Sequence, residues 1–465
     1  MPLPKAIGRQ KEVLYLPATG HVAVLGTAGS GKTTLAILRS AYLSDPATDH
    51  SGKTLLVTFN RGLVTYIKHL ASSELINVTV EHYHRFARGY LESMGKMGWN
   101  VIARPEERTA YITAAITKVA ASNAGHSLFA KSPKFIAEEI RWIAQHGCRT
   151  LTEYQTAPPE LPNDLPTATT LPLLWQIREA YLNERETDGK SYDWDDIAVC
   201  VRDQFTADTR ARRFRHVVID EGQDFSPAMI QSLTRAVPSD GSVTFFGDVA
   251  QQIYGSRSSW RSAGLNLKGT PWLFQENYRN TKQIAEVALA LTRMPFYSGI
   301  ADLVPPSAPK AAGPLPTLVK CPSVQREAEF VVQQAIQLSQ AGSVAILTTD
   351  HEARRYFSSL FQAGTFTELT NEMGTWESDS GLSIGTYHAA KGLEFDSVIL
   401  PRLDASRIPA PDDVISFGEQ RSFADAARLL YVGITRARQG LIMSCSASPT
   451  LLLPDRPELI QTIAI

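Results

Sequence analysis

The chain has 465 residues, of which 43% are hydrophobic and 20% charged, so it can bury a large core and should divide into two or more domains. Lysine plus arginine (46) nearly balance aspartate plus glutamate (47), which excludes a globally basic surface and requires any nucleic-acid site to be local. The four cysteines form no C-x-x-C pair, which argues against structural zinc, an iron–sulfur cluster and a disulfide framework.

The amino-terminal segment lacks the long apolar run of a secretory signal, and no run of about 18 apolar residues occurs in the chain. Widely spaced cysteines also fit a reducing compartment. We therefore expect a cytoplasmic protein with no membrane partner.

Short β-branched runs alternate with helix-length amphipathic segments in two parts of the chain. HVAVLG, TLLVTF and HVVID are each followed by such a segment, and this alternation predicts an α/β fold with parallel sheets. Between Tyr83 and about Phe205 the pattern changes to long helical stretches, which we interpret as an insertion in the first domain. Five prolines between Asp302 and Pro316 indicate an interdomain linker, and a second α/β domain follows.

These patterns predict the domain limits. We expect a first α/β domain at 1–82 and 206–297, a helical insertion at 83–205, a linker at 298–316 and a second α/β domain at 317–465.

The segment GTAGSGKT lies between an apolar strand and an amphipathic helix, and it matches the phosphate-binding loop G-x-x-x-x-G-K-[ST]. Glycines let the backbone N–H groups converge on phosphates, and the helix N-terminus adds favourable potential. We expect Lys32 to reach the β- and γ-phosphates of ATP and Thr33 to bind Mg²⁺. The candidate loop residues are Gly26, Thr27, Ala28, Gly29, Ser30, Gly31, Lys32, Thr33 and Thr34.

A second motif, HVVIDEGQDFS, runs from an apolar strand directly into Asp220 and Glu221. Ligands of open α/β sheets bind at this edge of the strands. We expect Asp220 to hold Mg²⁺ and Glu221 to orient and deprotonate the attacking water. Two carboxylates after a strand are commonplace, so the motif favours hydrolysis over a structural role only in combination with the phosphate-binding loop.

Five segments in order resemble the motif series of UvrD/Rep-like superfamily 1A helicases. They are DEGQDFS, FFGDVAQQIYG, ENYRNT, TYHAAKGLEFDSVIL and RLLYVGITRAR. The resemblance spans nearly the whole chain and implies two RecA-like motor domains around an ATP cleft, with the helical insertion as domain 1B. It also implies ATP-dependent movement on single-stranded or partly duplex DNA in the 3′-to-5′ direction.

The resemblance assigns further residues to the nucleotide. Gln10 is similar to a glutamine that reads adenine, Tyr278 to a tyrosine that packs on the base, and Gln251 to a sensor of the γ-phosphate. Arg279 and Arg436 resemble two arginines that contact the γ-phosphate. Glu394 resembles a residue that contacts the ribose, and Gly392 corresponds to a position near the triphosphate. For any single arginine, a surface ion pair is the competing interpretation.

The resemblance also implies a DNA path across both domains. Its candidate residues are Thr58, Phe59, Asn60, Tyr83, His84, Tyr254, Trp260 and His388. Trp260 enters because Ser256 stands where the family often has a stacking tryptophan. Aromatic stacking suits a motor that ignores base sequence, because every base has a π-face. For each aromatic residue, packing in the core is the alternative.

Two charged segments fit the family pattern less directly. DWDD (193–196) resembles an acidic family segment, and we predict that it is a structural cap and salt-bridge element. RARRFR (210–215) is interpreted as a solvated loop, with a phosphate contact as the alternative.

Only Thr365–Gly381 occupies the place of the 2B domain of full-length helicases, so we predict a reduced 2B domain and leave open whether this chain separates duplex strands. An alternative function is a DNA- or nucleotide-sensing ATPase subunit that regulates a partner nuclease, for example in antiviral defence. DNA repair is equally compatible with the motor motifs. A phosphate-loop kinase or transporter ATPase is a third interpretation, against which KGLEF and TRA count strongly.

Overall fold

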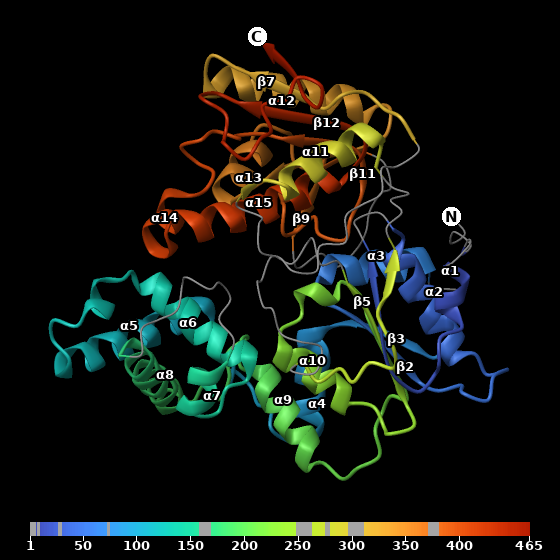
Figure 1. Cartoon of the computed structure of the whole chain (residues 1–465), viewed down its shortest axis with the longest axis vertical. Coiled ribbons are helices and arrows are strands. Elements are labelled where there is room, and N and C mark those ends of the chain that lie inside the picture. The colour runs from blue at the N-terminus through green and yellow to red at the C-terminus, as the bar shows by residue number, and fades with distance from the viewer. Residues whose placement is uncertain are drawn as a thin grey trace.

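A computed structural model describes residues 6, 10–26, 30–71, 75–157, 169–247, 263–274, 280–295, 311–370 and 381–465. Two parallel sheets and a separate body of helices make up this part of the chain, as Figure 1 shows. The predicted α/β fold with two RecA-like domains is confirmed.

The first sheet has six strands in the order β3-β2-β4-β5-β1-β6, and every pair is parallel. Its strands are β1 (Gly20–Gly26), β2 (Thr54–Thr58), β3 (Val78–His82), β4 (His216–Ile219), β5 (Ser242–Gly247) and β6 (Trp272–Phe274). Side chains alternate between the faces of a strand. Val22 and Val24 therefore join the core on one face of the sheet, whereas Ala23 and Leu25 join the core on the other.

Helices cover both faces of this sheet. One face carries α1 (Gln10–Leu14), α2 (Lys32–Ser44) and α3 (Arg61–Ala71). The other face carries α4 (Tyr83–Ser93), α9 (Ile197–Ala207) and α10 (Pro227–Arg235), and a short 3₁₀ helix, η2 (Gly222–Asp224), follows β4.

The helical body has its own hydrophobic core, formed by residues such as Ile112, Ile140 and Leu174. It consists of α5 (Pro105–Ser122), η1 (Ser127–Ala130), α6 (Pro133–His146), α7 (Leu151–Thr156) and α8 (Thr170–Thr187). The insertion expected at 83–205 is wider than this body, because α4 and α9 pack on the first sheet. We therefore propose that the insertion proper runs from α5 to α8.

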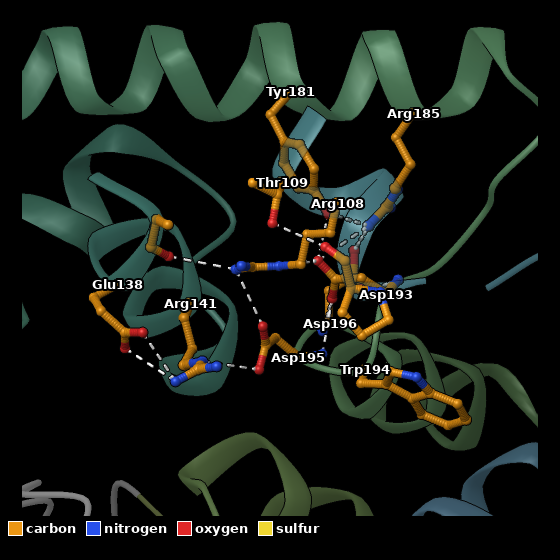
Figure 2. A network of polar contacts seen from close by, with 12 residues as sticks. Arg108, Thr109, Glu138, Arg141, Tyr181, Arg185, Asp193, Trp194, Asp195 and Asp196 are labelled. Carbon is orange, nitrogen blue, oxygen red and sulfur yellow. Dashed lines mark hydrogen bonds and ion pairs between the residues drawn. The ribbon is translucent and has the colours of Figure 1, made fainter. Parts of the chain in front are cut away.

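The acidic segment DWDD joins this body to the first domain, and Figure 2 shows its contacts. Asp193 accepts backbone hydrogen bonds from Asp195 and Asp196 at 2.8 Å each. Arg185 of α8 lies 2.6 Å from Asp196, and Arg108 of α5 lies 3.1 Å from Asp195. The predicted salt-bridge role of DWDD is confirmed.

The second sheet has seven strands in the order β13-β7-β12-β11-β8-β10-β9, again all parallel. They are β7 (Thr317–Lys320), β8 (Ser343–Thr348), β9 (Thr367–Leu369), β10 (Gly381–Thr386), β11 (Phe395–Leu400), β12 (Ala437–Cys445) and β13 (Gln461–Ala464). Its helices are α11 (Lys282–Thr292), α12 (Val324–Ser339), α13 (His351–Ser358), α14 (Pro411–Phe417) and α15 (Glu419–Thr435).

The sequence predicts that residues 206–297 belong to the first domain, and helix α11 differs from this prediction. Its apolar residues Ile284, Val287 and Leu291 instead join the core of the second sheet, beside α15. The chain therefore crosses to the second sheet before α11. Most of the predicted linker and of the reduced 2B segment lies outside the described residues.

Within the described ranges, no helix has the length and apolar character that crossing a membrane requires.

Candidate functional site

The phosphate-binding loop follows β1 and leads into α2. A Cβ atom on Gly26 would lie 2.4 Å from Ser30 Oγ, and Gly31 has a φ of +81°, so both positions favour glycine. Lys32 is buried, and its Nζ donates a 3.0 Å hydrogen bond to the carbonyl oxygen of Gly26. Thr33 and Thr34 continue the first turn of α2. Thr27, Ala28 and Gly29 lie outside the described residues.

Gln10 lies beside this loop, although sixteen positions separate it from Gly26 in the sequence. Its Nε2 donates a 3.3 Å hydrogen bond to the carbonyl oxygen of Ser30. Helix α1 packs on α2, which brings Gln10 to the loop. Gln10 therefore contacts the carboxyl-terminal part of the phosphate-binding loop directly.

Asp220 follows β4 and is completely buried. Neither carboxylate oxygen accepts a hydrogen bond of ordinary geometry from the described residues. Burial and the Glu221 carboxylate raise the pKa of Asp220 to about 7, while the Thr33 hydroxyl and Lys32 act in the opposite direction. A buried carboxylate without a hydrogen bond of ordinary geometry, beside a threonine hydroxyl, suits a hard divalent cation such as Mg²⁺.

Glu221 has an unusual backbone conformation, with a φ of +52°, which turns the chain sharply after β4. The side-chain amide of Gln223 donates a hydrogen bond to its carboxylate. Burial opposes ionisation of Glu221, but the positive charges of Lys32, Lys391 and Arg436 outweigh it and lower the pKa of this carboxyl. Groups from both sheets therefore act on one carboxylate.

Arg436 ends α15 and is completely buried. Its guanidinium donates to the carbonyl oxygens of Val432 (3.1 Å) and Leu393 (3.3 Å). Asn280 holds the same turn, because its amide donates to the carbonyl oxygens of Thr435 (3.2 Å) and Ala437. Asn280 thus connects the ENYRNT segment to the residues on either side of Arg436.

The other nucleotide candidates fall in two groups. Gly392 has a φ of +81° and lies against Leu63 of the first domain, where a Cβ atom would approach to 2.8 Å. Glu394 is exposed. Gln251, Tyr278 and Arg279 lie outside the described residues.

A buried ion pair joins the two sheets directly. Lys391 lies in the second domain and Asp224 in the first, and the two side chains are 6% and 5% exposed. Burial raises the pKa of Asp224 to about 6, although Lys391 lowers it. Asn60 adds a second connection, because its Nδ2 donates to the carbonyl oxygens of Ala389 (3.3 Å) and Lys391 (3.0 Å). The sequence analysis assigned no role to Lys391 or Asp224.

A groove of 1590 Å³ runs along both domains next to this ion pair. Its first wall contains residues after β2 and β3, one face of α4 and segment 208–214. Its second wall contains residues after β8, β9 and β10. Asp224 and Lys391 lie between these walls. Lys391 lowers the pKa of Glu221, and the Glu221 carboxylate raises the pKa of Asp224, so the groove adjoins the Glu221 carboxylate.

Three aromatic side chains form a cluster on the first wall: Phe59, His84 and Trp194. His84 meets the Phe59 ring at 5.7 Å and the Trp194 ring at 5.1 Å, both edge to face. Trp194 is 39% exposed, and the ion pairs of its neighbours in DWDD fix its segment (Figure 2). Trp194 is not among the residues predicted from the sequence, although an aromatic residue between acidic ones was a usable signal.

Two predicted DNA contacts do not face the groove. Tyr83 is completely buried, and its hydroxyl shares a 2.7 Å hydrogen bond with Ser232, so its ring offers no face to a base. The reason is that Tyr83 begins α4 on the side that packs against the first sheet. Thr58 is also completely buried at the end of β2. Both assignments are therefore corrected.

His388 is exposed on the second wall of the groove. Surrounding atoms, together with the charges of Lys391 and His351, lower its pKa to about 4, so it is neutral at neutral pH. Tyr254 and Trp260 lie outside the described residues.

Comparisons with known proteins give two family matches. A model described as the UvrD/REP helicase N-terminal domain matches residues 8–268. A model described as the UvrD-like helicase C-terminal domain matches residues 358–448.

Individual relatives are more distant. The ATP-dependent DNA helicase UvrD2 of Mycobacterium tuberculosis is 21% identical over 566 aligned positions, which cover 96% of this chain and 79% of that protein. DNA helicase II of Rickettsia typhi is 36% identical over 80 residues, or 17% of this chain and 12% of that protein. The solved C-terminal domain of a possible DNA helicase from Lactobacillus plantarum is 21% identical and covers 40% of this chain and 98% of that chain. Its TM-score of 0.29 is too low to bear on the fold.

Proposed function

Since the chain belongs to the UvrD/REP helicase family, we propose that it hydrolyses ATP to ADP and phosphate and uses the energy to move along single-stranded DNA. The observation that carries the proposal is the convergence of Lys32, Lys391 and Arg436 on Glu221, beside a groove lined by both domains. A site divided between two domains can link hydrolysis to a change in their relative position.

The first domain supplies the groups that bind the nucleotide. Lys32 leaves its hydrogen bond to Gly26 and contacts the β- and γ-phosphates, while Gln10 reads the adenine edge. Thr33 and Asp220 hold Mg²⁺, which supplies charge neutralisation on the phosphates when bound. The complete burial of Asp220 and the lack of a hydrogen bond of ordinary geometry to its oxygens support this assignment.

Glu221 acts on the attacking water. Its lowered pKa keeps it ionised, so it can orient the water and accept a proton from it. Because two of the three charges that hold it ionised come from the second domain, full activity requires the domains to be together. Separation of the domains would remove Lys391 and Arg436 from Glu221, so that its pKa would rise and less of it would be ionised.

The second domain supplies charge to the transferred phosphoryl group. Arg436 rotates from its backbone acceptors toward the γ-phosphate, where a guanidinium can bind two oxygens. Arg279 joins it, Gln251 senses the γ-phosphate, Tyr278 packs on the base, Glu394 contacts the ribose and Gly392 lies near the triphosphate. These six assignments come from the family motifs.

The groove holds the single strand. We place bases on the cluster of Phe59, His84 and Trp194, because stacking is independent of base identity. Asn60 and His388 face the strand at the junction of the domains. Movement in the 3′-to-5′ direction follows the family. Tyr254 and Trp260 remain further candidates for stacking.

A reduced 2B domain is part of the proposal. The alignment with the mycobacterial helicase has 566 positions, which exceeds the 465 residues of this chain by 101. Some residues of that relative therefore have no counterpart in this chain, which is the result expected if a domain of the relative is missing or reduced here. We expect translocation by the isolated chain to be stronger than its duplex unwinding.

The test is steady-state ATP hydrolysis with and without oligothymidylate, for wild type, Lys32→Ala and Glu221→Gln. We expect strong stimulation by DNA in the wild type and loss of hydrolysis in both variants, with single-strand binding retained in Glu221→Gln. Wild-type hydrolysis that ignores DNA would contradict an autonomous motor. It would favour the alternative, an ATPase subunit that regulates a partner such as a nuclease.

A further inference from the structure

The first wall of the groove continues beyond the aromatic cluster, along α4. This helix begins where β3 ends and lies beside α9 (Figure 1). Arg85, Arg88, Gly89 and Glu92 line the groove, and their spacing of three, four and seven positions places them on one helix face. At 1.5 Å per residue, Arg88 lies about 6 Å beyond His84 along the helix axis.

Segment 208–213 forms the other side of this extension, and it contains most of the RARRFR run. Six arginines line the first wall, and three carboxylates accompany them. The arginines are Arg61, Arg85, Arg88, Arg210, Arg212 and Arg213, and the carboxylates are Glu81, Glu92 and Asp208. The wall therefore carries net positive charge, although the whole chain is nearly neutral.

Four of these arginines are already engaged. Arg61 Nε donates a 3.1 Å hydrogen bond to Nε2 of His82. Arg85 lies 3.6 Å from Glu81, and Arg210 lies 2.9 Å from Asp208. Arg212 donates to the carbonyl oxygens of Phe205 and Asp208 at 2.9 Å and 3.0 Å. These contacts build the wall and occupy donor groups of the side chains.

Arg88 and Arg213 are different. Both are exposed, and neither forms an ion pair with a described carboxylate. Arg213 only covers the ring of Phe214, at 5.3 Å. Beside Arg88, a Cβ atom on Gly89 would meet nothing within 4 Å, so the surface here is open. Two unpaired guanidinium groups on one concave wall are suited to anionic oxygens.

We propose that Arg88 and Arg213 extend the nucleic-acid site by holding phosphates of the single strand beyond the aromatic cluster. The proposal rests on the proposed function. A DNA strand fits better than an acidic protein segment, because the extension is continuous with rings on which bases can stack. The proposed contacts are to phosphate oxygens, which fix the position of the strand and carry no sequence information.

The test uses Arg88→Gln/Arg213→Gln, which keeps polar side chains on an exposed surface. Binding of oligothymidylates of increasing length is measured over a range of salt concentrations. For single strands, each phosphate contact contributes about 0.7 to the slope of log K against log salt, so loss of two contacts should lower the slope by about 1.4. The affinity of the variant should also stop rising at a shorter oligonucleotide.

Two further variants make the result specific. Arg293→Gln removes an exposed arginine at the end of α11, outside the groove, and should leave the slope unchanged. Glu92→Gln removes an exposed carboxylate from the same face of α4 and should tighten binding. A thermal unfolding curve confirms that each variant is folded.

Equal slopes for the wild type and Arg88→Gln/Arg213→Gln would overturn the extension while leaving the motor intact. Failure of the wild type to bind oligothymidylate or to be stimulated by it would instead overturn the proposed function.

Discussion

The buried pair of Lys391 and Asp224 provides a quantitative prediction. Lys391→Met leaves a carboxylate without its partner at an almost fully buried position, which typically costs about 3–5 kcal/mol. Burial already outweighs Lys391 in setting the pKa of Asp224. The double substitution Lys391→Met/Asp224→Leu removes both charges and should be more stable than Lys391→Met alone.

The effect should depend on pH. Asp224 has a folded pKa of about 6, above its usual value of 3.8, so its ionised form disfavours the folded state as pH rises through this range. Glu221 adds negative charge nearby, whereas Lys391 and Arg436 add positive charge. Removing Lys391 raises the pKa of Asp224 further. The loss of stability in Lys391→Met should therefore be large at pH 8 and shrink toward pH 5.

Urea denaturation of the wild type, both single variants and the double variant measures this coupling as a double-mutant cycle. We expect the double variant to be more stable than the sum of the single effects predicts. Additive effects, or a Lys391→Met variant as stable as the wild type at pH 8, would refute the reasoning.

Three shorter predictions follow from other contacts. Asn280→Ala should lower kcat for ATP hydrolysis by about tenfold, because two backbone carbonyl oxygens beside Arg436 lose the amide that donates to them. An unchanged kcat in steady-state assays would contradict this positioning role. Arg185→Met should lower the free energy of unfolding, measured in urea, by about 3–5 kcal/mol, because Asp193 and Asp196 lose a buried partner. The control Lys118→Ala removes an exposed ion pair and should change this free energy by less than about 0.5 kcal/mol. Equal effects of the two substitutions would be inconsistent with the buried network. The pKa values of His82 and His388 are lowered to about 4, chiefly because surrounding protein atoms displace water from the rings, with nearby basic side chains adding to the effect. Both are therefore neutral above about pH 5, and oligothymidylate affinity should be flat from pH 6.5 to 8.5. A binding transition near pH 6.5 would show that one of them titrates normally.

Much of the nucleotide site is predictable from sequence because its chemistry is local. Glycines at Gly26 and Gly31 are required by a close approach and by a positive φ, and both lie within one short motif. Asp220 and Glu221 follow a strand whose apolar pattern is plain, and the carboxyl edge of a parallel sheet fixes their position. The α/β fold follows from the same alternation of strands and helices.

Other features depend on packing between distant residues. Lys391 and Asp224 are 167 positions apart and meet only because the two sheets lie together. Tyr83 belongs to an aromatic motif, but the direction of its side chain depends on which face of α4 packs on the sheet. Helix α11 follows the motifs of the first domain, yet its apolar face complements α15. Sequence spacing does not contain these relations.

The central claim is ATP-driven movement along single-stranded DNA, and translocation kinetics test it most directly. Oligothymidylates of several lengths carry a fluorophore at the 5′ or the 3′ end, and ATP is added to the preformed complex. With the fluorophore at the 5′ end, we expect the time of the fluorescence peak to increase in proportion to the length of the oligothymidylate. With the fluorophore at the 3′ end, the peak time should not depend on length. Glu221→Gln should show no length-dependent peak with either label. Signals that are independent of length at both ends, despite DNA-stimulated hydrolysis, would contradict the central claim.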